Sequence, residues 1–194
     1  MVVGLTGGMG CGKTTVLKYI GGKGAHTQSS DAVVHDLLAN DAVVIGAVAK
    51  HFGEGILDAK GKVDRSRLGS IVFGDDAELK WLEELLHPRA RERWQSFARK
   101  AGGGLRVVEI PLLFENNLEE FFDITVCVCA SLATQLERRK PHHLTEEQVR
   151  ARIDRQMPLA EKIERADHVV LNDGSIPFLE DQIDNLLNRT AAGR

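Results

Sequence analysis

Short apolar runs alternate with longer amphipathic stretches along this 194-residue chain. Such alternation is typical of buried strands that are each followed by a helix. The runs predict strands at residues 2–6, 25–29, 105–110, 124–129 and 168–171, of which 25–29 is the weakest because it is partly polar. The pattern therefore predicts an α/β fold in which helices flank a parallel sheet.

The alternation stops between residues 41 and 100, where the periodicity predicts helices and no strong strand. We therefore predict a core of residues 1–40 and 101–194 with a helical insertion at 41–100. An insertion of this kind can build the wall of a second substrate site or simply stabilise the core. The pattern alone does not favour either role over the other. The expected helices of the insertion span residues 41–52, 64–73, 75–86 and 88–100.

A glycine-rich stretch connects the first predicted strand to the first predicted helix. Its sequence, GGMGCGKT, has the G-x-x-x-x-G-K-[ST] spacing of a phosphate-binding loop. Glycines let backbone N–H groups turn onto a phosphate, and the helix N-terminus favours negative charge. Lys13 would reach the β- and γ-phosphates, and the Thr14 hydroxyl would ligate Mg²⁺. The residues expected to bind the nucleotide here are Gly8, Met9, Gly10, Cys11, Gly12, Lys13, Thr14 and Thr15.

Charge and composition narrow the class of partner. The chain has 25 basic and 28 acidic residues and a formal net charge of −3, which gives no support to general nucleic-acid binding. No apolar run approaches the ~20 residues of a membrane span. The first strand is expected directly after Met1, which leaves no room for a leader, and three cysteines do not suit a disulfide framework. We expect a cytoplasmic protein with a small-molecule substrate, and the oligomeric state stays open.

The three cysteines have different expected environments. Cys127 and Cys129 alternate with valines on one predicted strand and are expected in the core rather than in a metal site. Cys11 lies in the glycine-rich loop, near a helix N-terminus and Lys13. Both features stabilise a thiolate, so a lowered thiol pKa and sensitivity to oxidation are a hypothesis for Cys11.

Phosphoryl transfer needs an acceptor-orienting group, a carboxylate for Mg²⁺ and a cation near the developing charge. Asp31 follows the second predicted strand, where ligands bind in open α/β sheets, although it could instead cap the next helix. Glu109 ends an apolar run and could hold Mg²⁺ through water, or simply lie at a partly exposed strand end. These two residues and Lys13 are the first candidates for the chemistry.

Basic residues are frequent between residues 138 and 165, which suits a lid at about 139–157 that closes over a triphosphate. Acidic residues are interleaved with them, so most of these cations are expected on the surface. Arg138 is singled out because it lies on the helix that follows the strand at 124–129.

Several motifs follow the glycine-rich loop in a particular order. They include SSD at 29–31, DRSRL at 64–68, the pair His87-Pro88, EIPLLFE at 109–115, QLER at 135–138, RIDRQM at 152–157 and ADHVVLNDG at 166–174. In this order and spacing they resemble the dephospho-coenzyme A kinase family, from Val3 to about Leu187. The loop alone occurs in many small-molecule kinases, whereas PLLFE and His-Pro are much more specific.

The resemblance implies transfer of the γ-phosphate of ATP to the 3′-hydroxyl of dephospho-coenzyme A, with Mg²⁺, as the last step of coenzyme A synthesis. It implies a P-loop kinase core, a helical coenzyme-A-binding insertion at 41–100 and a small lid. Asp31 matches the catalytic aspartate of the family, and Arg138 matches its lid arginine. Asn172 and Gly174 match the loop beside the adenine, and the acceptor side is matched by His87, Arg91, Arg65 and Leu112.

The chain departs from the family pattern at three places. Ser29 replaces the first aspartate of Asp-Ala-Asp, and Glu109 replaces an aspartate. Residues 139–143 do not align with the family lid, which commonly carries a second arginine. Two alternatives remain: a P-loop kinase for another small-molecule acceptor, such as a shikimate-like one, or a nucleotide-binding module without turnover. His87-Pro88 argues against the first, and the lack of an Asn-Lys-x-Asp motif argues against a GTPase switch.

Overall fold

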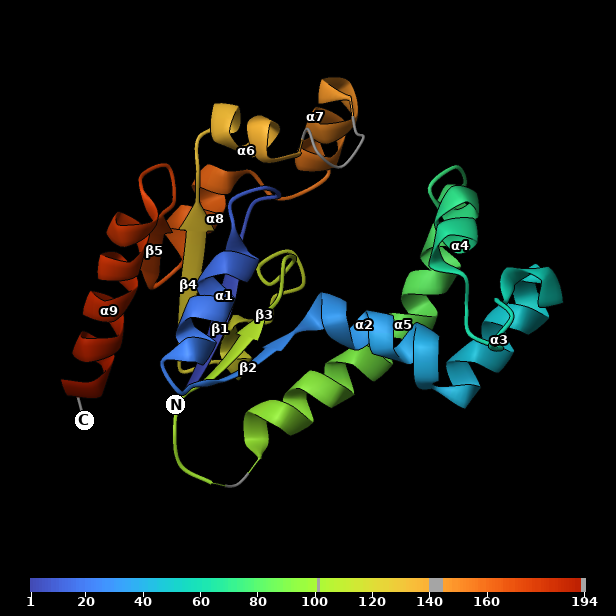
Figure 1. The fold of residues 1–194 in the computed structure, drawn as a ribbon, viewed down its shortest axis with the longest axis horizontal. Helices are drawn as coiled ribbons and strands as arrows, with labels where there is room; N and C mark the ends of the chain where they lie inside the picture. Colours follow the sequence, from blue (N-terminus) through green and yellow to red (C-terminus); the bar gives the residue numbers. More distant parts are fainter. Residues whose placement is uncertain (101, 140–144, 193–194) are drawn as a thin grey trace. The chain divides into compact units, whose positions relative to one another are not determined.

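The computed structural model describes residues 1–100, 102–139 and 145–192 (Figure 1). The chain divides into two compact units by the contacts between its residues. Unit 1 consists of Met1–Ser29 and Ala101–Arg194, and unit 2 consists of Ser30–Lys100. Each unit has its own hydrophobic core.

Unit 1 is built on a five-stranded sheet in which every neighbouring pair is parallel, with the order β2-β3-β1-β4-β5. Every strand predicted from the apolar runs is confirmed. The inner strands are buried on both faces, which is why β1 and β4 are mostly apolar, whereas β3 has the charged residues Arg106 and Glu109 at its two ends. The strands are β1 (Val2–Gly7), β2 (His26–Ser29), β3 (Arg106–Glu109), β4 (Ile124–Cys129) and β5 (His168–Leu171).

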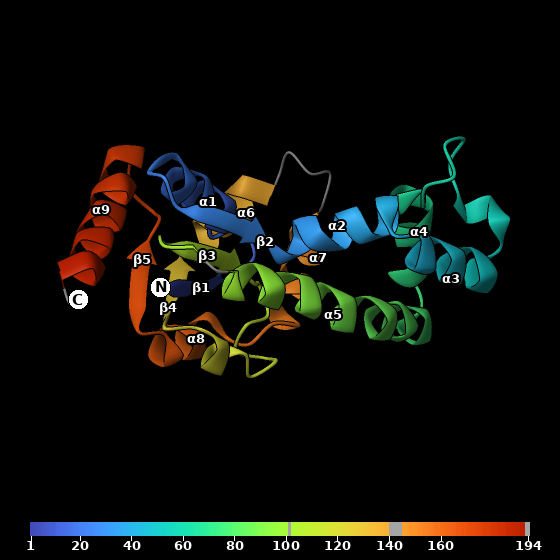
Figure 2. The same cartoon turned by 90° about the horizontal axis from the view of Figure 1, so that it is seen from below.

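Helices cover both faces of this sheet, and Figure 2 shows α1 and α8 on opposite faces. Leu5 and Val128 from the sheet pack with Val16 of α1 and Ile183 of α9 in a fully buried cluster. Because β1 and β3 pair in parallel, their carboxyl ends lie at the same edge of the sheet, where ligands bind in open α/β folds. The unit's helices are α1 (Lys13–Gly22), η2 (Glu119–Phe121), α6 (Leu132–Arg139), α7 (Glu146–Asp154), α8 (Leu159–Arg165) and α9 (Ile176–Ala192).

Unit 2 is helical, as the sequence predicts. Asp41, Asp64 and Asp75 precede three of its helices, and each accepts two backbone N–H groups of the first turn. The unit begins at Ser30 rather than at residue 41, which corrects the predicted boundary, because α2 packs its buried face into the cluster formed by α3, α4 and α5. The helices are α2 (Ser30–Asn40), α3 (Ala42–Phe52), η1 (Glu54–Ile56), α4 (Arg65–Val72) and α5 (Asp76–Arg99).

The long helix α5 passes through Pro88 without ending, so the prediction of separate helices at 75–86 and 88–100 is wrong. Proline in a helix interior removes one hydrogen bond and costs ~3 kcal/mol. The buried positions of α5 continue with a spacing of four residues on both sides of the proline, at Leu82, Leu86, Ala90 and Trp94. Burial of this stripe outweighs the local penalty.

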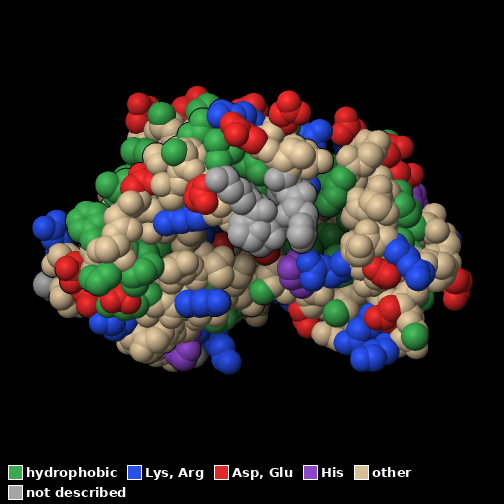
Figure 3. All heavy atoms as spheres, turned by 45° about the horizontal axis from the view of Figure 1, so that its top comes forward, with side chains coloured by type: hydrophobic (Ala, Val, Ile, Leu, Met, Phe, Trp, Pro, Cys, Tyr) green, Lys and Arg blue, Asp and Glu red, His purple; other side chains and the backbone are tan. Residues whose placement is uncertain are grey.

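The surface carries charges of both signs. Basic and acidic side chains are interspersed on the face drawn in Figure 3. Within the described residues, no single helix combines the length and apolar character needed to cross a membrane. By those two criteria alone the pair α2 and α3 would qualify together, with a bend of 73° between them.

Candidate active site

The glycine-rich loop lies between β1, which ends at Gly7, and α1, which begins at Lys13. Gly12 precedes α1 with a φ of 90°, in the left-handed region that favours glycine. A Cβ atom at Gly12 would lie 2.2 Å from Nδ2 of Asn172, and a Cβ at Gly10 would lie 2.9 Å from the backbone oxygen of Gln135. At both positions a side chain would collide with a neighbouring residue, and the backbone conformation also favours glycine.

The Lys13 side chain folds back along the loop and is only 9% exposed. Its Nζ atom donates hydrogen bonds to the backbone oxygens of Gly7 and Gly8, each at 3.0 Å. Thr14 and Thr15 lie in the exposed first turn of α1. The helix N-terminus thus presents the Thr14 hydroxyl to solvent while the ammonium group is held at the start of the loop.

Three segments of unit 1 meet at the backbone oxygen of Cys11. Nδ2 of Asn172 donates to it at 2.8 Å, and Nη1 of Arg138 lies 3.4 Å away. Nη2 of Arg138 also donates to the backbone oxygen of Asn172 at 2.8 Å. The loop, helix α6 and the turn after β5 are joined by these bonds. The structure therefore brings Arg138 and Asn172 together with the loop.

The turn that carries Asn172 is fixed by the next residue, Asp173. Its carboxylate accepts hydrogen bonds from the backbone N–H and the hydroxyl of Ser131. Hydrogen bonds from Thr134 and Ser131 hold the pKa of Asp173 below its usual value, against a smaller effect of burial. Gly174 follows in the same turn and is exposed. The ionised Asp173 thus ties the start of α6 to the residues after β5.

The hypothesis of a lowered thiol pKa at Cys11 is wrong. Cys11 is fully buried, and burial raises its pKa above the usual value, although Lys13 and Arg138 act in the opposite direction. A thiolate in an apolar environment loses its hydration, which outweighs these charges. The physical basis for oxidation sensitivity at Cys11 is removed. Burial also raises the pKa of Cys127 to about 12, which fits its predicted place in the core.

Glu109 ends β3 and is 3% exposed. In the sheet register it pairs with Leu5 of β1 and with Ser29 of β2. Leu112 lies half-buried in the turn that follows, where its backbone oxygen accepts two hydrogen bonds from Asn116. Among the described residues, no group of three or more His, Cys, Asp or Glu side chains could hold a metal alone. Glu109 and the Thr14 hydroxyl offer oxygen ligands, which suit Mg²⁺ with further ligands from water and phosphate.

Lys162 is one of the basic residues between 138 and 165, and it is completely buried. Its Nζ atom lies 2.7 Å from Oε1 of Glu115 and donates to the backbone oxygen of Pro111 at 2.8 Å. The same Glu115 oxygen accepts the backbone N–H of Met157 at 3.0 Å. A buried lysine needs such partners, because an uncompensated charge would be costly. The pair joins α8 and the end of the lid segment to the turn after β3.

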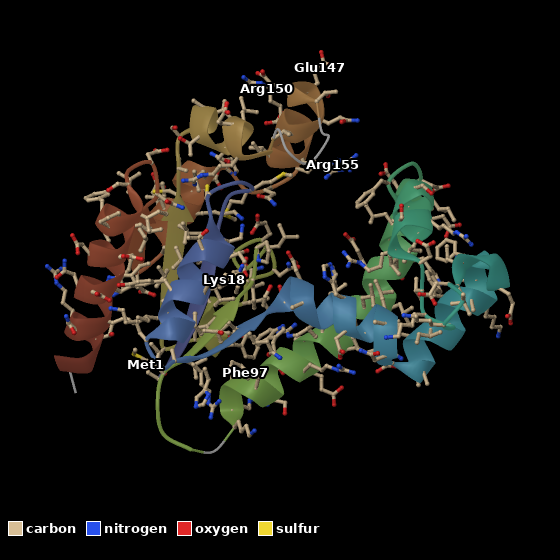
Figure 4. The ribbon with its side chains drawn as sticks, in the orientation of Figure 1. Met1, Lys18, Phe97, Glu147, Arg150 and Arg155 are labelled. Atoms are coloured by element: carbon tan, nitrogen blue, oxygen red, sulfur yellow. The ribbon has the colours of Figure 1, made fainter. Side chains whose placement is uncertain are left out.

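The predicted lid includes α7 and the loop before it, of which residues 140–144 lie outside the described residues. The capping box of Thr145 and Gln148 begins α7. Arg150 pairs with Glu146 within the helix at 2.7 Å. Arg155 is exposed just beyond the last turn, at the opposite end of α7 from Glu147 (Figure 4). The exposed Arg155 extends the set of basic groups on the described part of the lid.

The remaining candidates belong to unit 2. Asp31 is exposed in the first turn of α2, one position past the helix start, so it is not the capping residue. Arg65 begins α4, and its Nη2 atom lies 2.7 Å from Nε2 of His35. Burial and the Arg65 charge lower the pKa of His35, so its neutral ring can accept this bond. His87 and Arg91 are one turn apart on α5 and both exposed.

Sequence reasoning missed four residues with defined structural roles. Gln135 packs against Gly10, and Gln156 contacts the loop. His35 pairs with Arg65, and Lys162 pairs with Glu115. A signal was present for three of them, because Gln135 and Gln156 lie within the motifs QLER and RIDRQM, and Lys162 lies in the basic cluster. His35 had no signal beyond its place one helical turn after Asp31.

Comparison with known proteins agrees with the geometry of unit 1. A family model described as dephospho-CoA kinase matches residues 1–177. A dephospho-CoA kinase from Thermobifida fusca (strain YX) is 36% identical over 183 residues, covering 93% of this chain and 92% of that protein. The chain belongs to the dephospho-CoA kinase family. The family catalyses the final step of coenzyme A biosynthesis, and this kinase accordingly phosphorylates dephospho-CoA with ATP.

Solved structures agree with the family assignment. The structure of dephospho-CoA kinase from Campylobacter jejuni is 27% identical with a TM-score of 0.71, covering 99% of this chain and 98% of that chain. A shikimate kinase from Acinetobacter baumannii, solved with shikimate, is 17% identical with a TM-score of 0.55, covering 100% of this chain and 94% of that chain. At this identity the second likeness concerns the P-loop kinase fold alone and gives no support to a shikimate-like acceptor.

Proposed function

We propose that residues 8–15 of this kinase hold the phosphates of ATP and that Asn172 and Gly174 lie beside its adenine. The observation that carries this proposal is the meeting of Arg138, Asn172 and the loop at the Cys11 carbonyl. Backbone N–H groups, a helix N-terminus and two cations near one loop form a strong anion site. Lys13 would contact the β- and γ-phosphates, and Arg138 would stabilise charge on the transferring group.

Mg²⁺ is the proposed metal of the reaction, held by Thr14 and, through water, by Glu109. Both residues supply oxygen, the ligand atom that Mg²⁺ prefers, and the remaining ligands would be waters and phosphate oxygens. A bound Mg²⁺ supplies positive charge that the phosphates need. The chain's own part is to fix the hydroxyl at the start of α1 and the carboxylate at the end of β3.

The acceptor is proposed to bind to the residues of the helical insertion, with Asp31 acting on its 3′-hydroxyl. Asp31 would orient or deprotonate this hydroxyl for in-line attack on the γ-phosphate. Exposed cationic side chains suit the diphosphate of dephospho-CoA, since guanidinium groups bind phosphate oxygens in pairs. The proposed acceptor residues are His87, Arg91 and Arg65 of unit 2 and Leu112 of unit 1. Closure of the lid, residues 139–157, would then exclude water from the site, which prevents hydrolysis of ATP.

Reduced cysteines support a location in the cytoplasm, which we propose for this kinase. Cys11, Cys127 and Cys129 are all free and buried. Disulfides are rare in proteins of reducing compartments, whereas thiols persist there.

The metal assignment is tested by measuring ADP formation from ATP and dephospho-CoA. We expect no turnover in EDTA and full recovery with Mg²⁺. Glu109→Gln should raise the Mg²⁺ concentration for half-maximal activity roughly 10- to 100-fold, the usual cost of losing a group that orients a metal ligand. Glu120→Gln, which changes an exposed glutamate of η2, is the matched control and should cause no such rise.

Two outcomes would contradict these roles. Turnover that persists unchanged in EDTA would remove the metal from the reaction. An equal Mg²⁺ requirement in wild type and Glu109→Gln would remove Glu109 from the metal site and leave Thr14 as the remaining protein ligand.

A further inference from the structure

We propose that Gln156 is a positioning residue for Lys13 and acts through the peptide group between Gly8 and Met9. The proposal rests on the proposed role of Lys13 at the phosphates of ATP and adds a residue that controls it. Gln156 lies just after α7, at the carboxyl end of the predicted lid. The residue is half-buried, and its carboxamide oxygen, Oε1, accepts the backbone N–H of Met9 at 3.2 Å.

The two sides of this peptide group face different partners. The Gly8 carbonyl accepts the backbone N–H of Cys11 at 3.2 Å and Nζ of Lys13 at 3.0 Å. The described peptide bonds are all trans, and in a trans peptide the C=O and N–H groups point in opposite directions. The bond from Met9 to Gln156 therefore fixes the direction of the Gly8 carbonyl toward Lys13. Gln156 and Lys13 hold the same peptide plane from opposite sides.

Without the Gln156 carboxamide, the peptide group between Gly8 and Met9 loses the hydrogen bond on its N–H side. Gly8 has no Cβ, so rotation of the peptide between Gly8 and Met9 meets little steric resistance on the Gly8 side. Rotation would turn the Gly8 carbonyl away from Lys13, and the ammonium group would lose one of the two carbonyls that hold it at the start of the loop. Its position relative to the phosphates would then be less well defined.

The backbone around Gln156 is fixed well enough to impose this direction. The backbone N–H of Gln156 donates to the backbone oxygen of Ile153 at 2.9 Å, and this bond closes the last turn of α7. The N–H of Met157 donates to Oε1 of Glu115 at 3.0 Å, and this oxygen is held by the buried Lys162 at 2.7 Å. The carboxamide therefore extends from a segment anchored to the turn after β3. This arrangement connects the end of the lid to the catalytic lysine.

Gln156→Leu removes the acceptor while keeping an aliphatic side chain, and its effect is measured by calorimetric titration with ATP and with AMP. We expect ATP affinity and kcat to fall roughly fivefold, which corresponds to one hydrogen bond between neutral groups. AMP lacks the β- and γ-phosphates, so its affinity should not change. In a Lys13→Ala background the same substitution should weaken ATP binding no further, because its effect passes through Lys13.

Gln182→Leu is the matched control. This glutamine also accepts a backbone N–H, from Leu171 at 2.9 Å, but it lies on α9 against the edge strand β5. Its loss can lower the unfolding temperature, yet the ratio of ATP to AMP affinity should stay at the wild-type value. A change in this ratio in Gln156→Leu alone supports the proposal.

Three results would overturn the role of Gln156: unchanged ATP affinity and kcat, an equal loss of ATP and AMP affinity, or effects that add fully to those of Lys13→Ala. Each of these leaves the proposed function intact if Lys13→Ala itself abolishes transfer. If Lys13→Ala binds ATP and turns over like wild type, the phosphate role of Lys13 fails and the role of Gln156 fails with it.

Discussion

Replacing Lys13 with alanine is expected to abolish measurable phosphoryl transfer. Removing one preorganised group that stabilises transition-state charge costs roughly 10²- to 10³-fold in kcat, and Lys13 is held in place by two carbonyls of the loop. Because the Lys13 ammonium group would contact the β- and γ-phosphates, its loss should also lower the affinity for ATP. Both effects are measured by ADP release and by titration with ATP.

Lys18→Ala is the control for Lys13→Ala. Lys18 lies on the same helix α1 and is exposed (Figure 4). Its truncation should leave kcat and ATP affinity at wild-type values, and circular dichroism of both variants should confirm an intact fold. If Lys13→Ala keeps more than about a tenth of wild-type kcat, Lys13 does not stabilise the transferring phosphoryl group.

Asp31→Asn should lower kcat by about 10²- to 10⁴-fold, the usual contribution of a general base. Asparagine has nearly the same size but cannot take a proton from the 3′-hydroxyl. ATP affinity should hardly change, since Asp31 is assigned to the acceptor and not to the phosphates. The split between kcat and ATP affinity is measured by steady-state kinetics and ATP titration.

Asp76→Asn provides the comparison for Asp31→Asn. Asp76 is also an exposed aspartate in the first turn of a unit 2 helix, α5, so both substitutions remove a charge favoured at a helix N-terminus. Equal, small losses of stability and unchanged turnover in both variants would show that Asp31 only stabilises α2. A loss of turnover confined to Asp31→Asn supports its role in transfer.

The strands and the loop could be predicted because their signals are local. Buried parallel strands are largely apolar, so the runs that became β1 and β4, and the shorter apolar run at the centre of β3, could be recognised from the sequence alone. The spacing of Gly7 to Thr14 was likewise sufficient to predict a strand, a loop and a helix start. Local capping by Asp41, Asp64 and Asp75 also set helix starts to within one residue.

Features that depend on residues far apart in sequence could not be predicted. Pro88 suggests a helix end locally, but the buried stripe of α5 continues past it. Lys162 looks like a surface cation until Glu115 and Pro111 are seen beside it. Cys11 has local signals for a lowered pKa, yet its burial reverses the direction. In each case tertiary packing outweighs the local signal.

The glutamine at position 156 shows why part of the site was missed. Its side chain is uncharged, and its contact with Met9 joins positions 147 residues apart. A neutral carboxamide gives no sign in the sequence of whether it faces solvent or a backbone N–H. The motif RIDRQM marked the segment, but only the direction of the Gly8–Met9 peptide gave Gln156 a role.

Acceptor-dependent phosphoryl transfer is tested most directly by ADP release with ATP and Mg²⁺, in the presence and absence of dephospho-CoA, with the product analysed by mass spectrometry. We predict ADP release only when dephospho-CoA is present and a product heavier by one phosphate, located on the 3′-hydroxyl. Nucleotide that binds without any acceptor-dependent release of ADP would contradict this function.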